Sequence, residues 1–443
     1  MILKDKKIGV ISLGCDKNRV DSEKMLSLIS DFGSLTNDIT QANIIIINTC
    51  AFLQSSRKEA IDTIFECNAY RQSGKLEKLV VTGCLPQKFI GEIFDDLPEV
   101  DVFLGFKDYD YLKQALEKAY DGERVNFVGV EKEFKKIERV VTTPLNYAYL
   151  KIADGCNNHC TYCLIPYIRG KYVSETMESL VEEAAKLGNL SELILVAQDV
   201  TKYGEDLYGE VKLVELIKRL SALENVRSIR LLYCYPENID DKLIEEIATN
   251  DKVLKYIDIP LQHASDSVLK RMNRKGSGQF YSSLFKKLRE KIKGIAIRST
   301  FITGFPGETE EDFEILCDFV RKEKMFNVGF FAYSREEGTP AYKLPDQIDE
   351  KTKKHRVKQL YKIQKEVAKE IMKSFVGKTL EVVCDGIDYD NQLFIGRAYY
   401  SAPEIDGCVY FTSDSVVEQG EKYLVKIDKA KDYDLYGGTV ENE

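Results

Sequence analysis

Tyr147–Cys163 reads YAYLKIADGCNNHCTYC, an apolar strand that runs directly into three closely spaced cysteines. The spacing C-x3-C-x2-C joins Cys156, Cys160 and Cys163. We call these three residues the second triad, because another set of three cysteines precedes them in the chain. Three thiolates on one tight loop can hold three irons of a [4Fe–4S] cluster, which leaves the fourth iron open to a small chelating molecule. Zinc is the alternative metal, but a zinc site usually has C-x2-C pairs and a distant fourth ligand. His159, next to Cys160, is poorly placed to supply that ligand.

Around this loop, residues 144–348 repeat a strand–helix pattern six times. The pattern predicts strands that begin near Tyr147, Leu193, Ile229, Tyr256, Ile297 and Val328. Six such units indicate an incomplete parallel (β/α)6 barrel rather than a closed eight-stranded one. In such folds the chemistry lies at the carboxyl ends of the strands, where the second triad is found.

The flanking regions predict two further domains, so the expected fold class is α/β with three modules. Residues 1–120 alternate apolar runs with amphipathic stretches, as in a small doubly wound α/β domain. Residues 121–143 are polar and are expected to be a linker. The central domain, 144–375, ends in one amphipathic helix at 349–375. Short alternating strands with intervening glycines predict a small all-β barrel over 376–443.

A further set of cysteines, the first triad, lies in the N-terminal region. Cys15, Cys50 and Cys84 each end an apolar run. The carboxyl ends of parallel strands lie along one edge of a doubly wound sheet, so these thiols are expected to converge on another [4Fe–4S] cluster with one open iron. The simpler explanation is that a small cysteine packs well near a strand end.

Composition limits the other possibilities. The chain has 443 residues, 11 cysteines and three histidines, and no run approaches the ~18 apolar residues of a membrane helix. An odd number of thiols without a secretory signal predicts a cytoplasmic protein with no disulfide framework. The cysteines outside the two triads share no spacing and are expected to be structural: Cys67, Cys234, Cys317, Cys384 and Cys408.

With Tyr162 in its aromatic position, the loop of the second triad resembles the radical S-adenosylmethionine (SAM) superfamily, whose signature is C-x3-C-x-aromatic-C. The resemblance implies reductive cleavage of SAM to a 5′-deoxyadenosyl radical. Candidate SAM contacts at the strand ends are Gln198, Asp199, Gln262, Thr303, Gly304 and Glu308. The alternative for FITGFPGE (Phe301–Glu308) is a Gly/Pro turn that caps the next helix. His263 is more simply a hydrogen-bonded structural residue.

Two three-cysteine sites and a terminal β-barrel make the whole chain resemble the methylthiotransferases. The resemblance implies an N-terminal cluster domain, a radical-SAM barrel and a C-terminal TRAM domain. It also implies sulfur insertion into a C–H bond followed by methylation, with two SAM molecules consumed per product. One cluster would generate the radical, and the other would supply or carry sulfur.

Ser12–Glu23, SLGCDKNRVDSE, resembles the protein-modifying, RimO-type branch rather than the tRNA branch, which typically has T-x-G-C-Q-M-N. Asp16 replaces the usual proline. DIPLQHASD (258–266), EEGTPAYKLPDQI (336–348) and GRAYYSAPEIDG (396–407) also match this branch. The implied reaction is β-methylthiolation of an aspartate on the twelfth small-subunit ribosomal protein. The alternatives are a tRNA adenosine methylthiotransferase and a non-catalytic iron–sulfur or zinc protein that docks on ribosomes.

The distribution of charge offers evidence that does not depend on motifs. Of the formal net charge of −9, residues 377–443 contribute six Lys/Arg against fourteen Asp/Glu. An RNA-binding barrel needs a basic face, so this acidic one favours a basic ribosomal protein over tRNA. A general gain in solubility is the alternative. The helix at 349–375 is basic, but its periodicity suits packing with a solvated outer face. No pattern identifies the electron donor or the catalytic residue that positions the target carbon.

Overall fold

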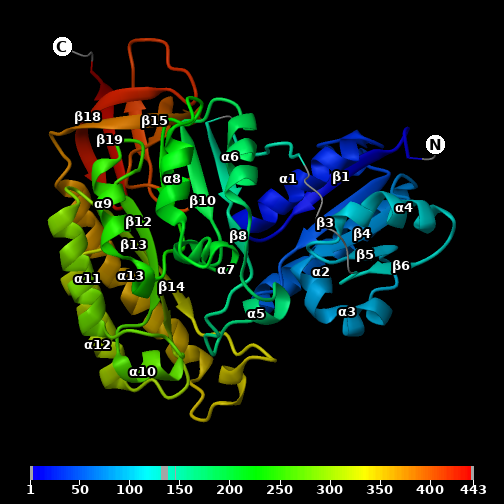
Figure 1. The fold of residues 1–443 in the computed structure, drawn as a ribbon, viewed down its shortest axis with the longest axis horizontal. Coiled ribbons are helices and arrows are strands. Elements are labelled where there is room, and N and C mark those ends of the chain that lie inside the picture. Colours follow the sequence, from blue (N-terminus) through cyan, green and yellow to red (C-terminus); the bar gives the residue numbers. More distant parts are fainter. Residues whose placement is uncertain (1–2, 131–137, 145, 441–443) are drawn as a thin grey trace. The chain divides into compact units, whose positions relative to one another are not determined.

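Residues 3–130, 138–144 and 146–440 are described by a computed structural model of the protein (Figure 1). The chain forms two compact units. The N-terminal unit comprises Met1–Thr142, Gly155–Asn157 and Cys163–Lys171, and the C-terminal unit comprises Thr143–Asp154, Asn158–Tyr162 and Tyr172–Glu443. Two short segments from the loop of the second triad therefore belong to the N-terminal unit.

A six-stranded parallel sheet in the order β2-β1-β3-β4-β5-β6 forms the centre of the N-terminal unit. Its strands are β1 (Lys7–Ser12), β2 (Ser34–Leu35), β3 (Ile44–Thr49), β4 (Lys78–Gly83), β5 (Val102–Leu104) and β6 (Val125–Phe127). The longer helices are α1 (Asp16–Ser30), α2 (Gln54–Asn68), α3 (Cys84–Asp96) and α4 (Leu112–Tyr120).

Alternation along the buried strands creates two hydrophobic cores. In β3, Ile45 and Ile47 pack with residues of α2 and α3, whereas Ile44 and Ile46 pack with residues of α1 and α4. Successive strand residues point to opposite faces, so helices cover both faces of the sheet. The predicted doubly wound α/β fold is confirmed.

Two N-terminal elements lie outside the sequence prediction. α3 begins at Cys84 itself, directly after β4, so an apolar strand and an apolar helix form one continuous run. β6 lies inside the predicted linker, where it extends the sheet beside β5. Residues 131–137 of the predicted linker are outside the described residues.

Six parallel strands form the partial barrel of the C-terminal unit. They are β7 (Tyr147–Lys151), β10 (Glu192–Val196), β11 (Ile229–Leu231), β12 (Tyr256–Gln262), β13 (Ala296–Thr303) and β14 (Asn327–Ala332). They form two three-stranded ladders, β7-β10-β11 and β12-β13-β14, and Cys234 N–H donates to Asp258 O where β11 and β12 meet. Each strand starts within one residue of its predicted position, which confirms the six βα units.

Helices connect these strands. They are α6 (Met177–Lys186), α8 (Leu213–Ser221), α9 (Asp241–Thr249), α10 (Asp266–Arg271), α11 (Gly278–Lys291) and α12 (Glu310–Glu323). α11 was not predicted, because serines and lysines separate its buried positions. Tyr281, Leu284, Phe285 and Leu288 nevertheless form a helical apolar face, and Ser277 caps the helix by accepting a hydrogen bond from Phe280 N–H.

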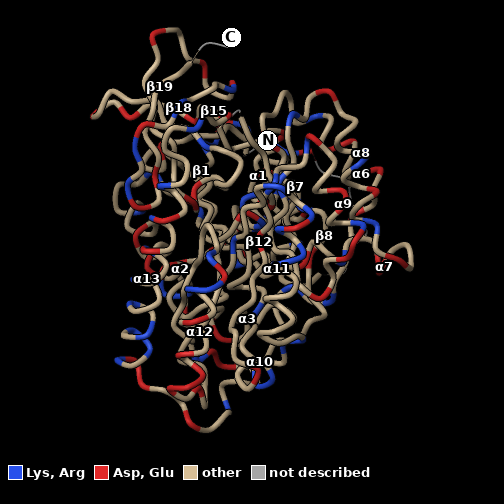
Figure 2. Tube along the Cα trace, turned by 90° about the vertical axis from the view of Figure 1, so that its left-hand side faces the viewer, with Lys and Arg blue, Asp and Glu red and all other residues tan. Residues whose placement is uncertain are grey.

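α13 (Glu350–Lys373) is the predicted amphipathic helix. Leu360, Val367, Ala368 and Met372 are buried, while lysines recur along the exposed side (Figure 2). The expectation of a packed helix with a solvated basic face is therefore confirmed. Across the described residues, no helix has the length and apolar character needed to span a membrane.

A closed five-stranded barrel ends the chain, in the order β15-β16-β17-β19-β18. Its strands are β15 (Thr379–Asp388), β16 (Leu393–Arg397), β17 (Val409–Thr412), β18 (Lys422–Lys431) and β19 (Asp434–Thr439). The prediction of a small all-β barrel is confirmed, although the sequence pattern indicates only four of its strands, in LEVVCDG, LFIGRAYY, GCVYF and YLVKID. β19 was missed because two adjacent glycines interrupt the apolar pattern of its DLYGGT sequence.

Buried ion pairs join this small barrel to the amino ends of the parallel strands. Glu192, the first residue of β10, contacts Arg230 at 2.5 Å and Arg397 at 2.7 Å, and Arg397 also contacts Asp385 at 2.6 Å. We call these four residues the base network. A neighbouring pair links Arg298 of β13 to Asp406 at 3.3 Å. The terminal barrel is therefore attached at the end of the parallel strands opposite to the strand end that leads into the second triad.

Candidate cluster sites at the strand ends

The first triad lies at the carboxyl ends of three adjacent strands. Cys15 follows β1, Cys50 follows β3, and Cys84 follows β4. The loops are tightly packed: a Cβ on Gly14, whose φ is +103°, would lie 2.9 Å from Cys50 Cβ and 3.5 Å from its Sγ. β1 and β3 are where the strand order reverses, the usual ligand site of a doubly wound sheet.

Asn18, at the start of α1, organises these loops. Its amide nitrogen donates to Leu13 O at 3.1 Å and to Thr49 O at 3.0 Å, which ties the ends of β1 and β3 together. Its Oδ1 lies 3.9 Å from the sulfurs of both Cys15 and Cys84. Thiols from strand ends far apart in the sequence are thus gathered around one buried amide.

Burial shapes the chemistry of this site. Burial raises the pKa of the Cys84 thiol to about 12 even though the nearby Arg169 charge opposes the shift. Burial also raises the pKa of Cys50. Thiols of this kind are held protonated until a metal replaces the proton, because metal binding requires the thiolate.

Several hydrogen bonds hold the loop of the second triad. Within the C-terminal unit, Thr161 N–H donates to Met272 O at 3.0 Å and its hydroxyl donates to Arg271 O at 2.8 Å. Asn158 Nδ2 donates to Asp199 Oδ2 at 3.1 Å. The conformation of the loop is therefore set by residues that follow other strands of the barrel.

The cysteines of this loop have polar neighbours. Cys160 Sγ lies 3.5 Å from the Tyr235 hydroxyl and 4.0 Å from Arg274 Nη1. The Arg274 guanidinium stacks on the Tyr235 ring at 4.1 Å. Within the N-terminal unit, Ile165 N–H points at Cys163 Sγ at 3.4 Å. Hydrogen-bonding groups therefore surround the sulfurs of Cys160 and Cys163.

The three-thiol donor set of each triad suits a four-iron cluster, and the choice between such a cluster and zinc stays a prediction. Two sulfurs on one zinc, each at about 2.3 Å, are at most about 4.6 Å apart. Among the described residues, no three His, Cys, Asp or Glu side chains are gathered closely enough for a single metal ion. A cubane places each thiolate on its own iron, so its ligands lie further apart.

Gln198 and Asp199, which were predicted together, have different surroundings. Both side-chain polar atoms of Gln198 are buried with no hydrogen-bond partner among the described residues, so they are available to a ligand. The Asp199 carboxylate accepts hydrogen bonds from Thr201 and from Asn158. Asp199 thus holds the cysteine loop, and its direct contact with SAM stays a prediction.

Gln262 ends β12 with φ +75°, which is unusual for a residue with a side chain. The register of β12 against β13 shifts between Ile259 and Gln262. Backbone strain of this kind concentrates at ligand sites, which supports the prediction for Gln262. Its neighbour His263 is fully buried and accepts a hydrogen bond from Ser265 N–H at 3.0 Å, as the structural interpretation expects.

Glu308 shapes the loop after β13. Its carboxylate accepts hydrogen bonds from the Thr303 hydroxyl at 2.9 Å, Gly304 N–H and Phe305 N–H, and Arg356 lies 3.2 Å away. Although burial opposes ionisation, the neighbouring His263, Arg356 and Thr303 hold the pKa of Glu308 below its usual value. Glu308 therefore organises the backbone near the strand end, and contact of this loop with adenosine stays a prediction.

Three further polar groups near the carboxyl ends of the parallel strands were not predicted from the sequence. Glu237 has both carboxylate oxygens buried without a partner, and Arg274 Nε and the Tyr333 hydroxyl are also buried and unpartnered. Burial raises the pKa of Glu237, with the Arg274 charge opposing. The position of Glu237 in YPEN, just after a predicted strand, was the available signal. Buried polar groups need partners, so these residues are candidates for contact with a ligand.

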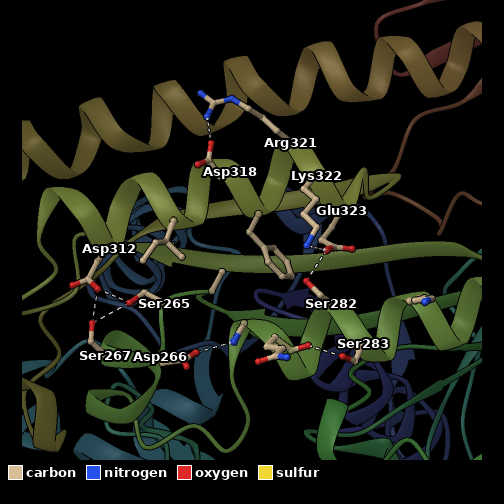
Figure 3. A pocket seen from close by; sticks show the side chains of 16 residues that line it. Ser265, Asp266, Ser267, Ser282, Ser283, Asp312, Asp318, Arg321, Lys322 and Glu323 are labelled. Atoms are coloured by element: carbon tan, nitrogen blue, oxygen red, sulfur yellow. Dashed lines mark hydrogen bonds and ion pairs between the residues drawn. The ribbon is translucent and has the colours of Figure 1, made fainter.

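A separate groove of about 1260 Å³ lies between α10, α11 and α12 (Figure 3). It contains none of the predicted site residues. The hydroxyls of Ser265 and Ser267 donate to Asp312, and they hold its pKa at about 2 although burial opposes this. Arg271 lies 3.3 Å from Asp312 and donates to Gly307 O at 2.8 Å. The wall of the groove therefore supports the loop that Glu308 organises.

Family models match all three modules. Residues 7–105 match uncharacterized protein family UPF0004, residues 150–320 match the Radical SAM superfamily, and residues 376–440 match the TRAM domain. The solved structures of the SAM methyltransferase TsrM from Kitasatospora setae and of the radical enzyme OxsB have TM-scores of 0.54 and 0.50. They cover 84% and 81% of this chain, and 79% and 56% of their own, at 13% and 12% identity, so they support the fold alone.

Full-length relatives are more specific. Curated proteins named ribosomal protein uS12 methylthiotransferase RimO from Clostridium tetani, Lachnoclostridium phytofermentans and Acetivibrio thermocellus are 47%, 49% and 46% identical to this chain. The alignments cover 97–98% of this chain and 97–99% of the relatives. The chain therefore belongs to the RimO family of radical-SAM methylthiotransferases.

Proposed function

We propose that this enzyme methylthiolates the β-carbon of an aspartate side chain on ribosomal protein uS12. The observation that carries the proposal is identity of 46–49% over nearly the whole chain to proteins named for that reaction. The alternatives, a tRNA adenosine methylthiotransferase and a non-catalytic docking protein, lack comparable support.

The proposal includes two [4Fe–4S] clusters, one on each cysteine triad. With SAM bound, a cluster on the second triad would supply the radical chemistry that removes hydrogen from the substrate carbon. Cys156, Cys160 and Cys163 would hold that cluster, and the unpartnered amide of Gln198 is a candidate to orient SAM. Cys15, Cys50 and Cys84 would hold the cluster that carries sulfur, and Asn18 lies close to the sulfurs of Cys15 and Cys84.

The acidic terminal barrel supports a basic protein substrate, but only some of its carboxylates contribute to the charge of its surface. Asp385 and Asp406 are paired with arginines inside the C-terminal unit, so they add little to the surface field. Carboxylates such as Asp390, Asp414 and Glu418 are exposed. Because this barrel is attached at the amino ends of the parallel strands, we infer that it attracts uS12 by its field rather than by contact at the reacting carbon. A cytoplasmic setting is part of this proposal.

Anaerobic incubation of the reconstituted enzyme with SAM, a chemical reductant and either uS12 or tRNA tests the substrate. We expect uS12 to gain the mass that results when a methylthio group replaces one hydrogen, located on an aspartate by peptide mass spectrometry, and tRNA to gain nothing. A gain on tRNA with none on uS12 would contradict the proposed substrate. Failure to form 5′-deoxyadenosine with iron fully loaded would instead favour the docking protein.

A further inference from the structure

Arg169 places a buried cation at the first triad, although it follows the second triad in the sequence. It comes directly after α5 (Ile165–Ile168) and lies within the N-terminal unit. Its Nη2 donates to Asn18 Oδ1 at 2.6 Å and lies 3.6 Å from Cys84 Sγ. The guanidinium thus contacts both the amide that gathers the first triad and one of its sulfurs.

Packing fixes Arg169 in this position. Leu164 and Ile168, on either side of the turn, are buried in the hydrophobic core that contains Cys84. The guanidinium lies 4.7 Å from the centre of the Phe106 ring, which follows β5. Arg169 is itself only 4% exposed. A long side chain held in one place loses little further freedom when a ligand binds beside it.

Asp21 balances the charge of Arg169. Asp21 Oδ2 lies 3.3 Å from Arg169 Nη2, and both side chains are almost fully buried. The two charges of this buried ion pair act in opposite directions on negative charge at the first triad. The cation stabilises added negative charge and its counter-charge opposes that effect, and each acts more strongly than it would in water.

We propose that Arg169 is a positioning residue for a cluster held by Cys15, Cys50 and Cys84, and that the Arg169–Asp21 pair sets how readily this cluster is reduced. The inference rests on the proposed cluster at the first triad. Three thiolates give the site a net negative charge that grows when an electron is added. Net charge and nearby charges tune the reduction potentials of iron–sulfur clusters. Loss of the cation disfavours the reduced form, and loss of its counter-charge favours it.

The test is a potentiometric titration followed by electron paramagnetic resonance. It uses the full chain with Cys156, Cys160 and Cys163 changed to Ala, so that only the first triad binds iron. With R169Q, we expect the ratio of reduced to oxidised cluster at a fixed potential to fall at least about tenfold, which is about 59 mV. With D21N the ratio should rise, and R169K should stay within about threefold of the parent because it keeps the charge.

Arg71 provides a matched control. It pairs with Asp101 in the same unit, at the amino end of β5, far along the strands from the triad. R71Q should leave the potential unchanged, because the lost charge lies at the other end of the sheet.

The outcomes separate this proposal from the one on which it rests. Absence of iron from the parent triple variant would overturn the cluster at the first triad, and this inference with it. Full iron with R169Q and D21N shifted in the same direction, or unshifted, would overturn the role of Arg169 alone. If R169Q binds no iron, the D21N variant tests the charge effect by itself. A ratio of reduced to oxidised cluster in D21N that is no higher than in the parent would contradict the proposed effect.

Discussion

Changing Cys156, Cys160 and Cys163 together to Ala should abolish formation of 5′-deoxyadenosine and remove about half of the bound iron. The reason is that these thiols would hold the one cluster to which SAM binds, while the first triad keeps its own loops and the Asn18 amide. Iron and sulfide analysis, Mössbauer spectra and chromatography of the nucleoside products measure the result.

The complementary variant changes Cys15, Cys50 and Cys84 to Ala. We expect it to lose the methylthio product while 5′-deoxyadenosine still forms. Cys67→Ala is the control, because Cys67 is a buried thiol of α2 outside both triads and its loss should leave iron unchanged. Loss of all iron, or of none, in either triple variant would contradict the two-cluster assignment.

Glu192→Gln should destabilise the C-terminal unit by about 3–5 kcal/mol, because it leaves Arg230 and Arg397 buried without their shared carboxylate. Urea unfolding followed by circular dichroism, with hydrogen exchange to locate the loss, measures the effect. Glu381→Gln is the matched control: Glu381 pairs with Lys422 at 2.6 Å, but the pair is exposed. Its loss should cost at most about 1 kcal/mol. An equal loss in both variants would contradict a stabilising base network.

We also expect the destabilisation caused by Glu192→Gln to depend on pH. Although burial favours the neutral acid, Arg230 and Arg397 hold the pKa of Glu192 at about 2, against 4.5 for the free side chain. A carboxyl whose pKa is lowered on folding stabilises the folded state above its unfolded pKa, and this contribution is lost as pH falls toward the folded value. The difference in stability between wild type and E192Q should therefore be constant above about pH 5 and shrink toward pH 2. A difference that stays constant down to pH 3 would contradict the low pKa.

The parts of the fold that could be predicted depend on local patterns. Apolar runs gave the six strands of the central domain to within a residue, because strand and helix periodicities are properties of neighbouring residues. α11 and β19 were missed because their polar or glycine-rich sequences hide a buried face that only packing reveals. β6 was missed for a related reason, since an edge strand of three residues is stabilised by the sheet beside it.

The residues of the candidate sites also fall into those that the sequence predicts and those that only the structure identifies. Asp199 and Glu308 were predicted as contacts of SAM, which stays a prediction. In the structure the Asp199 carboxylate binds Thr201 and Asn158, and the Glu308 carboxylate binds its own loop. Glu237 and Tyr333 were not predicted, although their buried oxygens have no partner among the described residues. Sequence identifies which polar residues follow a strand, but it does not show which hydrogen bonds they have already made.

By itself the sequence determined the second triad, because C-x3-C-x2-C confines three thiols to one loop by covalent spacing alone. It also determined the number of βα units and the uneven distribution of charge. Only the tertiary structure decided that Asn18 lies between the sulfurs of Cys15 and Cys84, where β1, β3 and β4 end side by side. It also decided that Arg169 reaches Cys84 and that the acidic barrel attaches at the amino ends of the parallel strands. These features join residues far apart in the chain, and their pairing depends on strand order and burial, which local spacing does not specify.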